Sequence, residues 1–212
     1  MAEEIIIHLR DLGVELVEAW RREFTGIASV QISQGDIFST KAGPLSPGDP
    51  IDVTADAIVS PANSFGFMDG GIDAVFTYQL GPQVQERLRE RLARDFGGEL
   101  HVGHAVIVPT GRHEIPWCIS APTMRIPGIV ADTPNAYLAF RAALTAVLTH
   151  NRGKQQPIRS VLCPGLATAV GRMPVARCAR QMRAAWNRVL GGESFVPGSL
   201  HEAAQDERDL LR

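Results

Sequence analysis

Hydrophobic positions along the chain follow two different spacings. Short β-branched or nearly continuous apolar runs, such as Ile5–Leu9 and Ala55–Ser60, are typical of buried strands. Other stretches, such as Val14–Phe24 and Gln83–Phe96, place apolar residues at the spacing of one helix face. We therefore expect strands at 5–9, 30–32, 55–60, 105–109, 117–121 and 159–163, and helices at 14–24, 72–80, 83–96, 135–150 and 174–190. Pro174 is expected as the first residue of the last helix.

Strands that alternate with helices predict an α/β fold in which helices cover both faces of a mostly parallel sheet. In such a fold the ligand site lies at the carboxyl ends of the strands. The length of 212 residues fits one domain, which we assign to residues 1–192. Residues 41–50, rich in Gly, Pro and Ser, are expected to form a loop. Residues 193–212 carry five acids and two arginines, and we expect a loosely ordered or helical tail there.

Composition narrows the classes of function. Lys and Arg number 21 against 23 for Asp and Glu, so the chain has no overall positive field, and a nonspecific nucleic-acid coat protein is disfavoured. No apolar run reaches the roughly 18 residues that a membrane helix needs. The acidic start Met1–Glu4 does not fit a signal peptide. We therefore expect a cytoplasmic protein with a core built from its 45% hydrophobic residues.

The cysteine and histidine patterns predict no metal site. Cys118, Cys163 and Cys178 are odd in number and too widely spaced for a Cys-x-x-Cys pair, so reduced and mostly buried thiols are expected. Cys163 stands at a strand end and could be read as a nucleophile, but no histidine pairs with it in the sequence, and packing is the preferred interpretation. His101 and His104 have a ligand-like spacing without an acidic or cysteine partner nearby, which favours surface or turn positions.

Two loops rich in small residues connect a predicted strand to a predicted helix. They are Ser60–Asp73 and Pro164–Pro174. Small residues allow a backbone to approach a ligand closely, and amides at a helix start attract anions, so the two loops together could hold a diphosphate. The alternative is that both are simply tight connections. Neither is a Walker motif, because five residues separate Gly165 from Gly171 and Arg172 follows in place of lysine.

Four motifs, taken in order, resemble those of the macrodomains. Gln34–Ile37 resembles the Gly-Asp-Ile motif after an early strand, and Asp56–Asn63 is similar to the strand end Asp-Ala-Ile-Val-Asn-Ala-Ala-Asn. Gly70–Asp73 resembles the end of the glycine-rich first loop, with Asp73 ten positions after Asn63 as in the MacroD-type hydrolase branch. Gly165–Pro174 resembles the diphosphate loop. The resemblance covers about residues 30–190.

The resemblance implies a three-layer α/β/α domain with a central mixed, mostly parallel sheet. It implies ADP-ribose binding and hydrolysis of ADP-ribosyl linkages on proteins or on small ADP-ribose derivatives, with no metal and no cofactor. The expected partners are ADP-ribose or a mono-ADP-ribosylated substrate, and no membrane. Two alternatives stay open: a non-catalytic reader of ADP-ribose or a related nucleotide, and a domain that docks to a protein or nucleic acid through an arginine-rich helix.

Site roles follow from the resemblance residue by residue. Asp36 would accept a hydrogen bond from the adenine amino group and the Ile37 amide would contact the ring; the alternative is an Asp that caps a turn. Asn63 would hold the distal ribose hydroxyls, or else satisfy the strand-end backbone. Asp73 would position or activate water, or else only stabilise a helix start. The remaining expected ligand contacts are Gly70, Gly71, Gly165, Ala167, Thr168, Ala169, Val170 and Gly171.

The chain also departs from the family pattern. Ser60 replaces the first asparagine of the strand-end motif, and Asp69 replaces a glycine and brings negative charge towards the phosphates. Ala167 and Ala169 stand where glycines are common, and because alanine disfavours positive φ we expect a differently folded loop. The helix that follows carries no acid and has Arg177, Arg180, Arg183 and Arg188, which form either an anion-steering surface or, as we prefer, a solvated face directed at acids elsewhere.

Overall fold

A computed structural model describes residues 5–41, 43–45, 49–152 and 156–212 of the chain. Within these residues, six strands form one sheet in the order β2-β1-β6-β3-β5-β4. The strands are β1 (Ile6–Asp11), β2 (Val30–Gln34), β3 (Ala57–Ser60), β4 (Val106–Pro109), β5 (Trp117–Ser120) and β6 (Ser160–Cys163). All neighbours are parallel except β4, which runs antiparallel to β5 at one edge. The expected mixed, mostly parallel sheet is confirmed.

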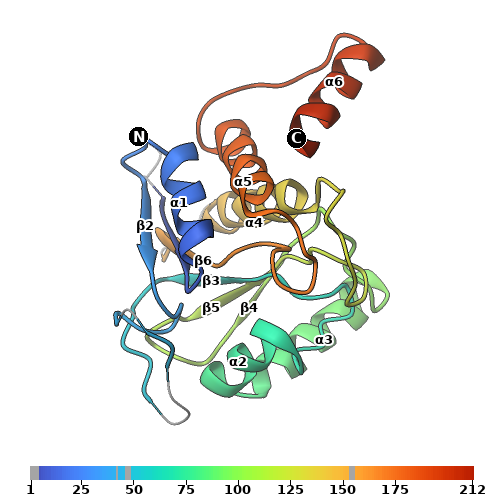
Figure 1. Cartoon of the computed structure of the whole chain (residues 1–212). Coiled ribbons are helices and arrows are strands. Elements are labelled where there is room, and N and C mark those ends of the chain that lie inside the picture. Colours follow the sequence, from blue (N-terminus) through green and yellow to red (C-terminus); the bar gives the residue numbers. More distant parts are fainter. Residues whose placement is uncertain (1–4, 42, 46–48, 153–155) are drawn as a thin grey trace.

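Helices cover both faces of this sheet. They are α1 (Val14–Glu23), α2 (Gly71–Leu80), α3 (Gln83–Phe96), α4 (Asn135–Asn151), α5 (Val175–Val189) and α6 (Leu200–Leu211). In Figure 1, α2 and α3 lie below the sheet, α1, α4 and α5 lie above it, and α6 lies outside α5. The three-layer α/β/α architecture expected from the sequence is therefore confirmed.

Each face of the sheet has its own hydrophobic core, because side chains along a strand alternate between the two faces. On the α1, α4 and α5 side the core includes Ile7, Leu9, Trp20 and Phe140, all of them fully buried. On the α2 and α3 side the core is built from Ile58, Phe38, Phe76, Leu88 and Leu92. The two cores pack against the two faces of the sheet and hold the strands in place. The loops at the strand ends lie outside these cores, where they can form a binding site.

Two sequence expectations about the C-terminal part change in detail. Pro174 directly precedes α5 instead of opening it, and its ψ of 133° is extended, so Val175 is the first helical residue. The tail, expected to be loosely ordered or helical, contains the helix α6. Arg188 of α5 pairs with Asp206, and Leu210 is only 5% exposed. Helix α6 is therefore held against α5 near its end.

The cysteines and the loop after β2 follow the sequence expectations as far as the structure describes them. Cys118, Cys163 and Cys178 are free and buried, and burial raises the pKa of each thiol. The loop expected at residues 41–50 has no regular structure in its described part, while residues 42 and 46–48 lie outside the described residues. No helix in the described ranges has the length and apolar character to span a membrane.

Candidate functional site

A pocket of about 190 Å³ opens at the carboxyl ends of the central strands. One wall is the loop between β3 and α2, with Asn63, Asp69 and Gly70, together with the first turn of α2, with Gly71 and Asp73. The opposite wall is the loop between β6 and α5, with Gly165 and residues 167–171. Because β3 and β6 are parallel neighbours, both loops leave the sheet at the same edge. The structure thus brings together most of the predicted site residues from these two loops.

The loop between β6 and α5 closes on itself through its backbone. The amide of Met173 donates to the carbonyl of Ala167 at 3.0 Å, and the amide of Arg172 donates to the carbonyl of Ala169 at 3.1 Å. Ala167 has a φ of 63°, so the expectation that alanine would exclude positive φ is wrong at this position. The residue is 5% exposed, and this packing holds it in a left-handed conformation that costs an alanine about 1–2 kcal/mol.

This closed loop leaves a row of amides available to a ligand. Within the part of the chain that the structure describes, the backbone N–H groups of residues 168–171 donate to no protein acceptor. The first turn of α2 lines the other wall, and the first N–H groups of a helix have no intrahelical acceptor. Unpaired amides on two walls are suited to bind the oxygens of an anion such as a diphosphate.

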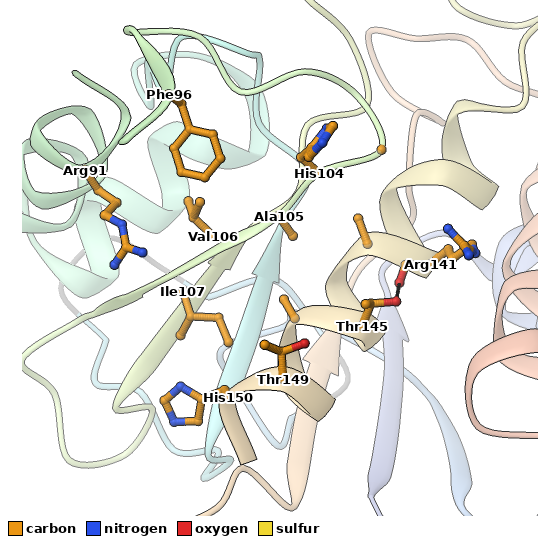
Figure 2. Close-up of a pocket in the computed structure, with 13 residues that line it drawn as sticks. Arg91, Phe96, His104, Ala105, Val106, Ile107, Arg141, Thr145, Thr149 and His150 are labelled. Carbon is orange, nitrogen blue, oxygen red and sulfur yellow. Dashed lines mark hydrogen bonds between the residues drawn. The ribbon is translucent and has the colours of Figure 1, made fainter. Parts of the chain in front are cut away.

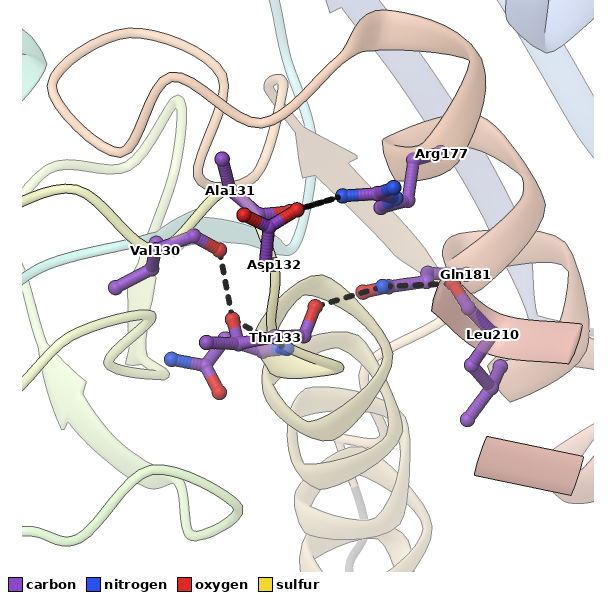
Figure 3. Close-up of polar contacts among 8 residues, drawn as sticks. Val130, Ala131, Asp132, Thr133, Arg177, Gln181 and Leu210 are labelled. Carbon is purple, nitrogen blue, oxygen red and sulfur yellow. Dashed lines mark hydrogen bonds and ion pairs between the residues drawn. The ribbon is translucent and has the colours of Figure 1, made fainter. Parts of the chain in front are cut away.

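The loop before α4 contacts the pocket-lining loop between β6 and α5. The amide of Val130 donates to the carbonyl of Gly171 at 2.9 Å. Figure 3 shows how this segment is held: Arg177 of α5 donates to the Ala131 carbonyl and to Asp132. The fully buried Gln181 donates to the carbonyls of Thr133 and Leu210 at 2.8 and 3.0 Å. The position of Gly171 is therefore tied to α5 and, through Gln181, to the last turn of α6.

A substitution at Gly171 should displace this loop. A Cβ at Gly171 would lie 2.4 Å from the Ala167 carbonyl oxygen and 2.8 Å from Cγ2 of Val130. Since the first of these atoms is backbone, Gly171→Ala should lower the free energy of unfolding by about 1–3 kcal/mol, measured by urea denaturation. Gly70→Ala is the matched control, because a Cβ at Gly70 meets no atom within 4 Å. Equal losses in the two variants would show that Gly171 is not a close-packed position.

Asn63 is engaged by its own loop. Its Nδ2 donates to the Phe67 carbonyl at 2.8 Å, and its Oδ1 accepts from the amides of Phe65 and Phe67 at 3.1 and 3.3 Å. The residue also lines the pocket. The structure therefore shows the strand-end role, and a contact with ribose hydroxyls has to use the remaining hydrogen-bonding capacity of the same amide.

Asp73 is a buried carboxylate at the pocket. It lies in the first turn of α2, is 8% exposed, and its Oδ1 accepts a hydrogen bond of 2.7 Å from the hydroxyl of the fully buried Ser60. Burial raises the pKa of Asp73 to about 6 from an ordinary value of 3.8. The hydrogen bond from Ser60 lowers this pKa, and the charge of Asp69 raises it. A carboxyl group with these properties exchanges a proton close to neutral pH.

Asp36 and Ile37 do not line the pocket. They follow β2, and the Asp36 carboxylate accepts from the amides of Phe38 and Leu45 at 2.9 and 3.2 Å, while Ile37 is buried. Arg10, 7% exposed, holds this turn, since its Nε donates to the Asp36 carbonyl at 2.7 Å. The turn-capping role of Asp36 is thus present in the structure, and its expected adenine contact stays a prediction.

The comparison with family models decides the family. The Macro domain model matches residues 59–182, more than half of the chain, and this range contains the whole pocket. The chain belongs to the macrodomain family. The MacroD-type branch is a finer assignment, which stays a prediction from the ten-residue interval between Asn63 and Asp73.

Similar proteins agree with the macrodomain assignment. An uncharacterised protein of Aquifex aeolicus is 32% identical over 135 residues, which cover 64% of this chain and 74% of that protein. An O-acetyl-ADP-ribose deacetylase of Salmonella typhimurium is 37% identical over 65 residues, or 31% of this chain and 35% of the deacetylase. The solved structure of an Oceanobacillus iheyensis macrodomain mutant with ADPR has a TM-score of 0.56 at 20% identity, covering 74% of this chain and 87% of that one. This structural likeness shows the fold.

The arginine side chains of α5 in this macrodomain contact other parts of the domain. Arg177 binds Ala131 and Asp132, Arg183 donates to the Glu23 carbonyl at 2.8 Å, and Arg188 pairs with Asp206. The side chains of Arg177 and Arg188 are 17% and 16% exposed. The preferred sequence interpretation is a solvated face directed at acids elsewhere. The contacts to acids and carbonyls agree with it, but the side chains are largely buried and not solvated. They weigh against docking of a polyanion through α5.

The positions of His101 and His104 follow the sequence expectation. His101 and His104 lie on a turn, in which the amide of His104 donates to the His101 carbonyl at 3.0 Å. Among the residues that the structure describes, no group of three or more His, Cys, Asp or Glu side chains could hold a metal ion.

Sequence reasoning missed a third wall of the pocket. Thr123, Met124 and Pro127 follow β5 and line the pocket. Thr123 is held beside the first loop, because its amide donates to the Ala62 carbonyl at 3.2 Å and its hydroxyl to the Pro61 carbonyl at 3.2 Å. This wall depends on the pairing of β5 with β3, which no local motif indicates. Phe67 of the first loop was missed as well; it lies at the rim with Arg89 stacked 4.4 Å from its ring centroid.

Proposed function

We propose that this macrodomain binds ADP-ribose and hydrolyses an ADP-ribosyl linkage on a protein or on a small ADP-ribose derivative. The observation that supports the proposal most is the buried Asp73 at a pocket that also has unpaired amides on two walls. The similarity to a protein named O-acetyl-ADP-ribose deacetylase, although it covers only 31% of the chain, points in the same direction.

The diphosphate would lie between the two loops. The amides of residues 168–171 would bind one phosphate and the start of α2 would attract the other, since helix N-termini carry partial positive charge. Asp69 is exposed at this pocket and opposes an anion there. No arginine or lysine lines the pocket among the residues that the structure describes, so the amides have to supply the attraction.

The pocket is smaller than the whole ligand. Its volume of about 190 Å³ lies below the roughly 300–1,000 Å³ usual for sites that enclose a complete small molecule. We therefore assign the distal ribose and part of the diphosphate to the pocket and the adenine to the open surface towards Asp36. An ionised carboxylate has about four acceptor positions, and the Asp36 carboxylate uses two of them for the amides of Phe38 and Leu45.

The proposed reaction is attack by water on the anomeric carbon of the distal ribose. The bond from this carbon to the leaving atom breaks (oxygen in a Glu or Ser linkage, nitrogen in an Arg linkage), the leaving group departs with the electron pair, and the Asp73 carboxylate takes a proton from the attacking water. A base with a pKa near the working pH suits this step, and the pKa of about 6 for Asp73 meets that condition. Ser60 would orient the carboxylate through its hydrogen bond to Oδ1.

A reader without turnover is the second candidate. The observation that favours it is the engagement of Asn63 by its own loop, because a catalytic asparagine needs its amide for the ribose. Incubation with proteins that carry mono-ADP-ribose on Glu, Arg or Ser, followed by detection of free ADP-ribose, separates the two candidates. Release from at least one linkage supports the hydrolase, and binding without release from any linkage supports the reader. For either candidate we propose a cytoplasmic location.

ADP-ribose should bind to and stabilise the folded protein. At a concentration 100 times its dissociation constant, a ligand that binds only the folded state adds about 2.7 kcal/mol to the free energy of unfolding. Calorimetric titration and thermal unfolding measure the two effects. Ribose 5-phosphate, which lacks the adenine, the adenosine ribose and one phosphate, should bind more weakly. Absence of both heat and thermal shift at millimolar ADP-ribose would contradict the proposed ligand.

A further inference from the structure

A second cavity, of about 450 Å³, lies along the edge strand β4. It shares no lining residue with the pocket at the carboxyl ends of the strands. Residues 103–107 form its floor, Arg91 and Phe96 come from the α3 side, and α4 supplies the other wall. Figure 2 shows Arg91 and Phe96 on one side of the strand and Thr145, Thr149 and His150 on the other. We call this cavity the edge groove.

The backbone of β4 is open towards the edge groove. Thr110, just after β4, donates its amide to the Pro116 carbonyl at 2.9 Å, so its backbone faces the β5 side. In an antiparallel pair, successive residues alternate between facing the partner strand and facing away. Val108 and Val106 therefore face β5, and the N–H and C=O of Ile107 point to the open edge. Among the described residues, no group outside the sheet binds these two backbone atoms.

Only one end of the exposed edge of β4 is protected against pairing with another strand. Pro109 is the next residue that faces outwards; it has no N–H, and its carbonyl accepts from Arg87 at 2.9 Å. Proline is a common means of preventing edge strands from pairing with other chains, because it has no N–H to donate. Ile107 keeps its outward N–H, so a strand that pairs with β4 has to do so on the side of Ile107 away from Pro109.

The walls leave room for an added strand. The face of α4 at the edge groove has small side chains: Ala142, Thr145, Ala146 and Thr149. These small side chains line the edge groove, whose volume is about 450 Å³. An extended segment at the edge could therefore form backbone hydrogen bonds with Ile107 and direct alternate side chains towards α3 and α4.

Charge favours an acidic occupant. Among the described residues, Arg91 and Arg141 line the edge groove, and no Asp or Glu does. Arg91 pairs with Asp95, but Asp95 also pairs with Arg94, so one carboxylate serves two guanidinium groups. A second copy of the chain would bring the same basic side chains to the edge, and like charges would then face each other.

We propose that the edge groove binds an acidic polypeptide segment in extended conformation, which pairs with Ile107 and extends the sheet beyond β4. The segment belongs to a partner protein with acidic side chains spaced at alternate positions. This inference is independent of the proposed hydrolase function, because the edge groove and the ligand pocket have separate residues.

Fluorescence anisotropy with two labelled eight-residue peptides tests this. One alternates glutamate with valine, and the other alternates lysine with valine. The glutamate peptide should bind with a dissociation constant below about 1 mM, and the lysine peptide at least about tenfold more weakly. No binding of the glutamate peptide, or equal binding of both peptides, overturns the proposal. A dimer that forms with rising protein concentration and excludes the peptide overturns it in favour of a second copy.

Two variants locate the binding. Arg91→Glu should weaken the glutamate peptide about tenfold through charge, and Ile107→Pro should do so by removing the outward N–H, which an edge strand tolerates. Arg22→Glu makes the same charge change on an exposed position of α1, which packs at the other edge of the sheet, and should leave binding unchanged. Thermal unfolding checks that each variant is folded. Binding that Arg91→Glu and Arg22→Glu affect equally overturns the site.

Discussion

Replacing Asp73 with asparagine should reduce single-turnover release of ADP-ribose by about 10²- to 10⁴-fold, the range for loss of a general base. The amide keeps the size of the side chain and an Oδ1 acceptor for Ser60, but it cannot take a proton from water. ADP-ribose affinity should hardly change, because the carboxylate acts on water and not on the diphosphate. In the wild type, the rate should fall as the pH drops below about 6, where Asp73 becomes protonated.

Asp69→Asn is the control for this effect. Asp69 lines the same pocket but is exposed, and its charge is one cause of the raised pKa of Asp73. This variant should keep turnover within about tenfold of the wild type and move the acidic limb of the pH profile to lower pH. If Asp73→Asn keeps wild-type turnover on the linkage that the protein cleaves, Asp73 has no part in the chemical step.

The same Asp73→Asn substitution should make the protein more stable at neutral pH. A carboxyl group whose pKa rises from 3.8 to about 6 on folding opposes folding by about 3 kcal/mol once it is ionised in both states. The folded state then holds the proton more tightly than the unfolded state. The penalty is absent below pH 4, grows as the pH rises from about 4 to about 6, and is complete above that range.

Urea denaturation at pH 4 and pH 7.5 measures this effect. The variant should match the wild type at pH 4 and exceed it by up to about 3 kcal/mol at pH 7.5. A helix-start role alone predicts the opposite sign, a loss of about 0.3–1 kcal/mol at pH 7.5, because a negative charge in the first turn stabilises a helix. A gain in stability together with a loss of turnover would identify a residue kept for chemistry at the expense of folding.

The order of strands and helices could be predicted from the sequence because it depends on local periodicity. The run Ala55–Ser60 is apolar on both faces, and in the structure β3 is buried throughout and lies between two parallel neighbours. The position of β1 between β2 and β6 could not be predicted, since lateral strand order depends on packing between distant segments. The docking of α6 depends in the same way on single contacts such as that of Arg188 with Asp206.

The site was predicted where it consists of continuous loops. Asn63, Asp73 and the residues of the second loop line one pocket because each loop follows a strand and the two strands are neighbours. Thr123 and Met124 were not predicted, because their place depends on β5 pairing with β3. Ala167 was interpreted wrongly, since residue preference alone disfavours a φ of 63°, whereas burial and the hydrogen bond from Met173 enforce it.

Asp11, at the end of β1, connects two segments that lie far apart in the sequence. Its Oδ2 accepts from the amide of Gly165 at 3.2 Å and its Oδ1 from the amide of Gly13 at 2.8 Å. One carboxylate thus ties the start of α1 to Gly165, near the start of the loop between β6 and α5. The stretch 59–182 that matches the Macro domain model omits this anchor. A protein trimmed to residues 59–182 would therefore lose the hydrogen bond between Asp11 and the amide of Gly165. The same bond would be lost if the pocket were grafted onto another scaffold without β1.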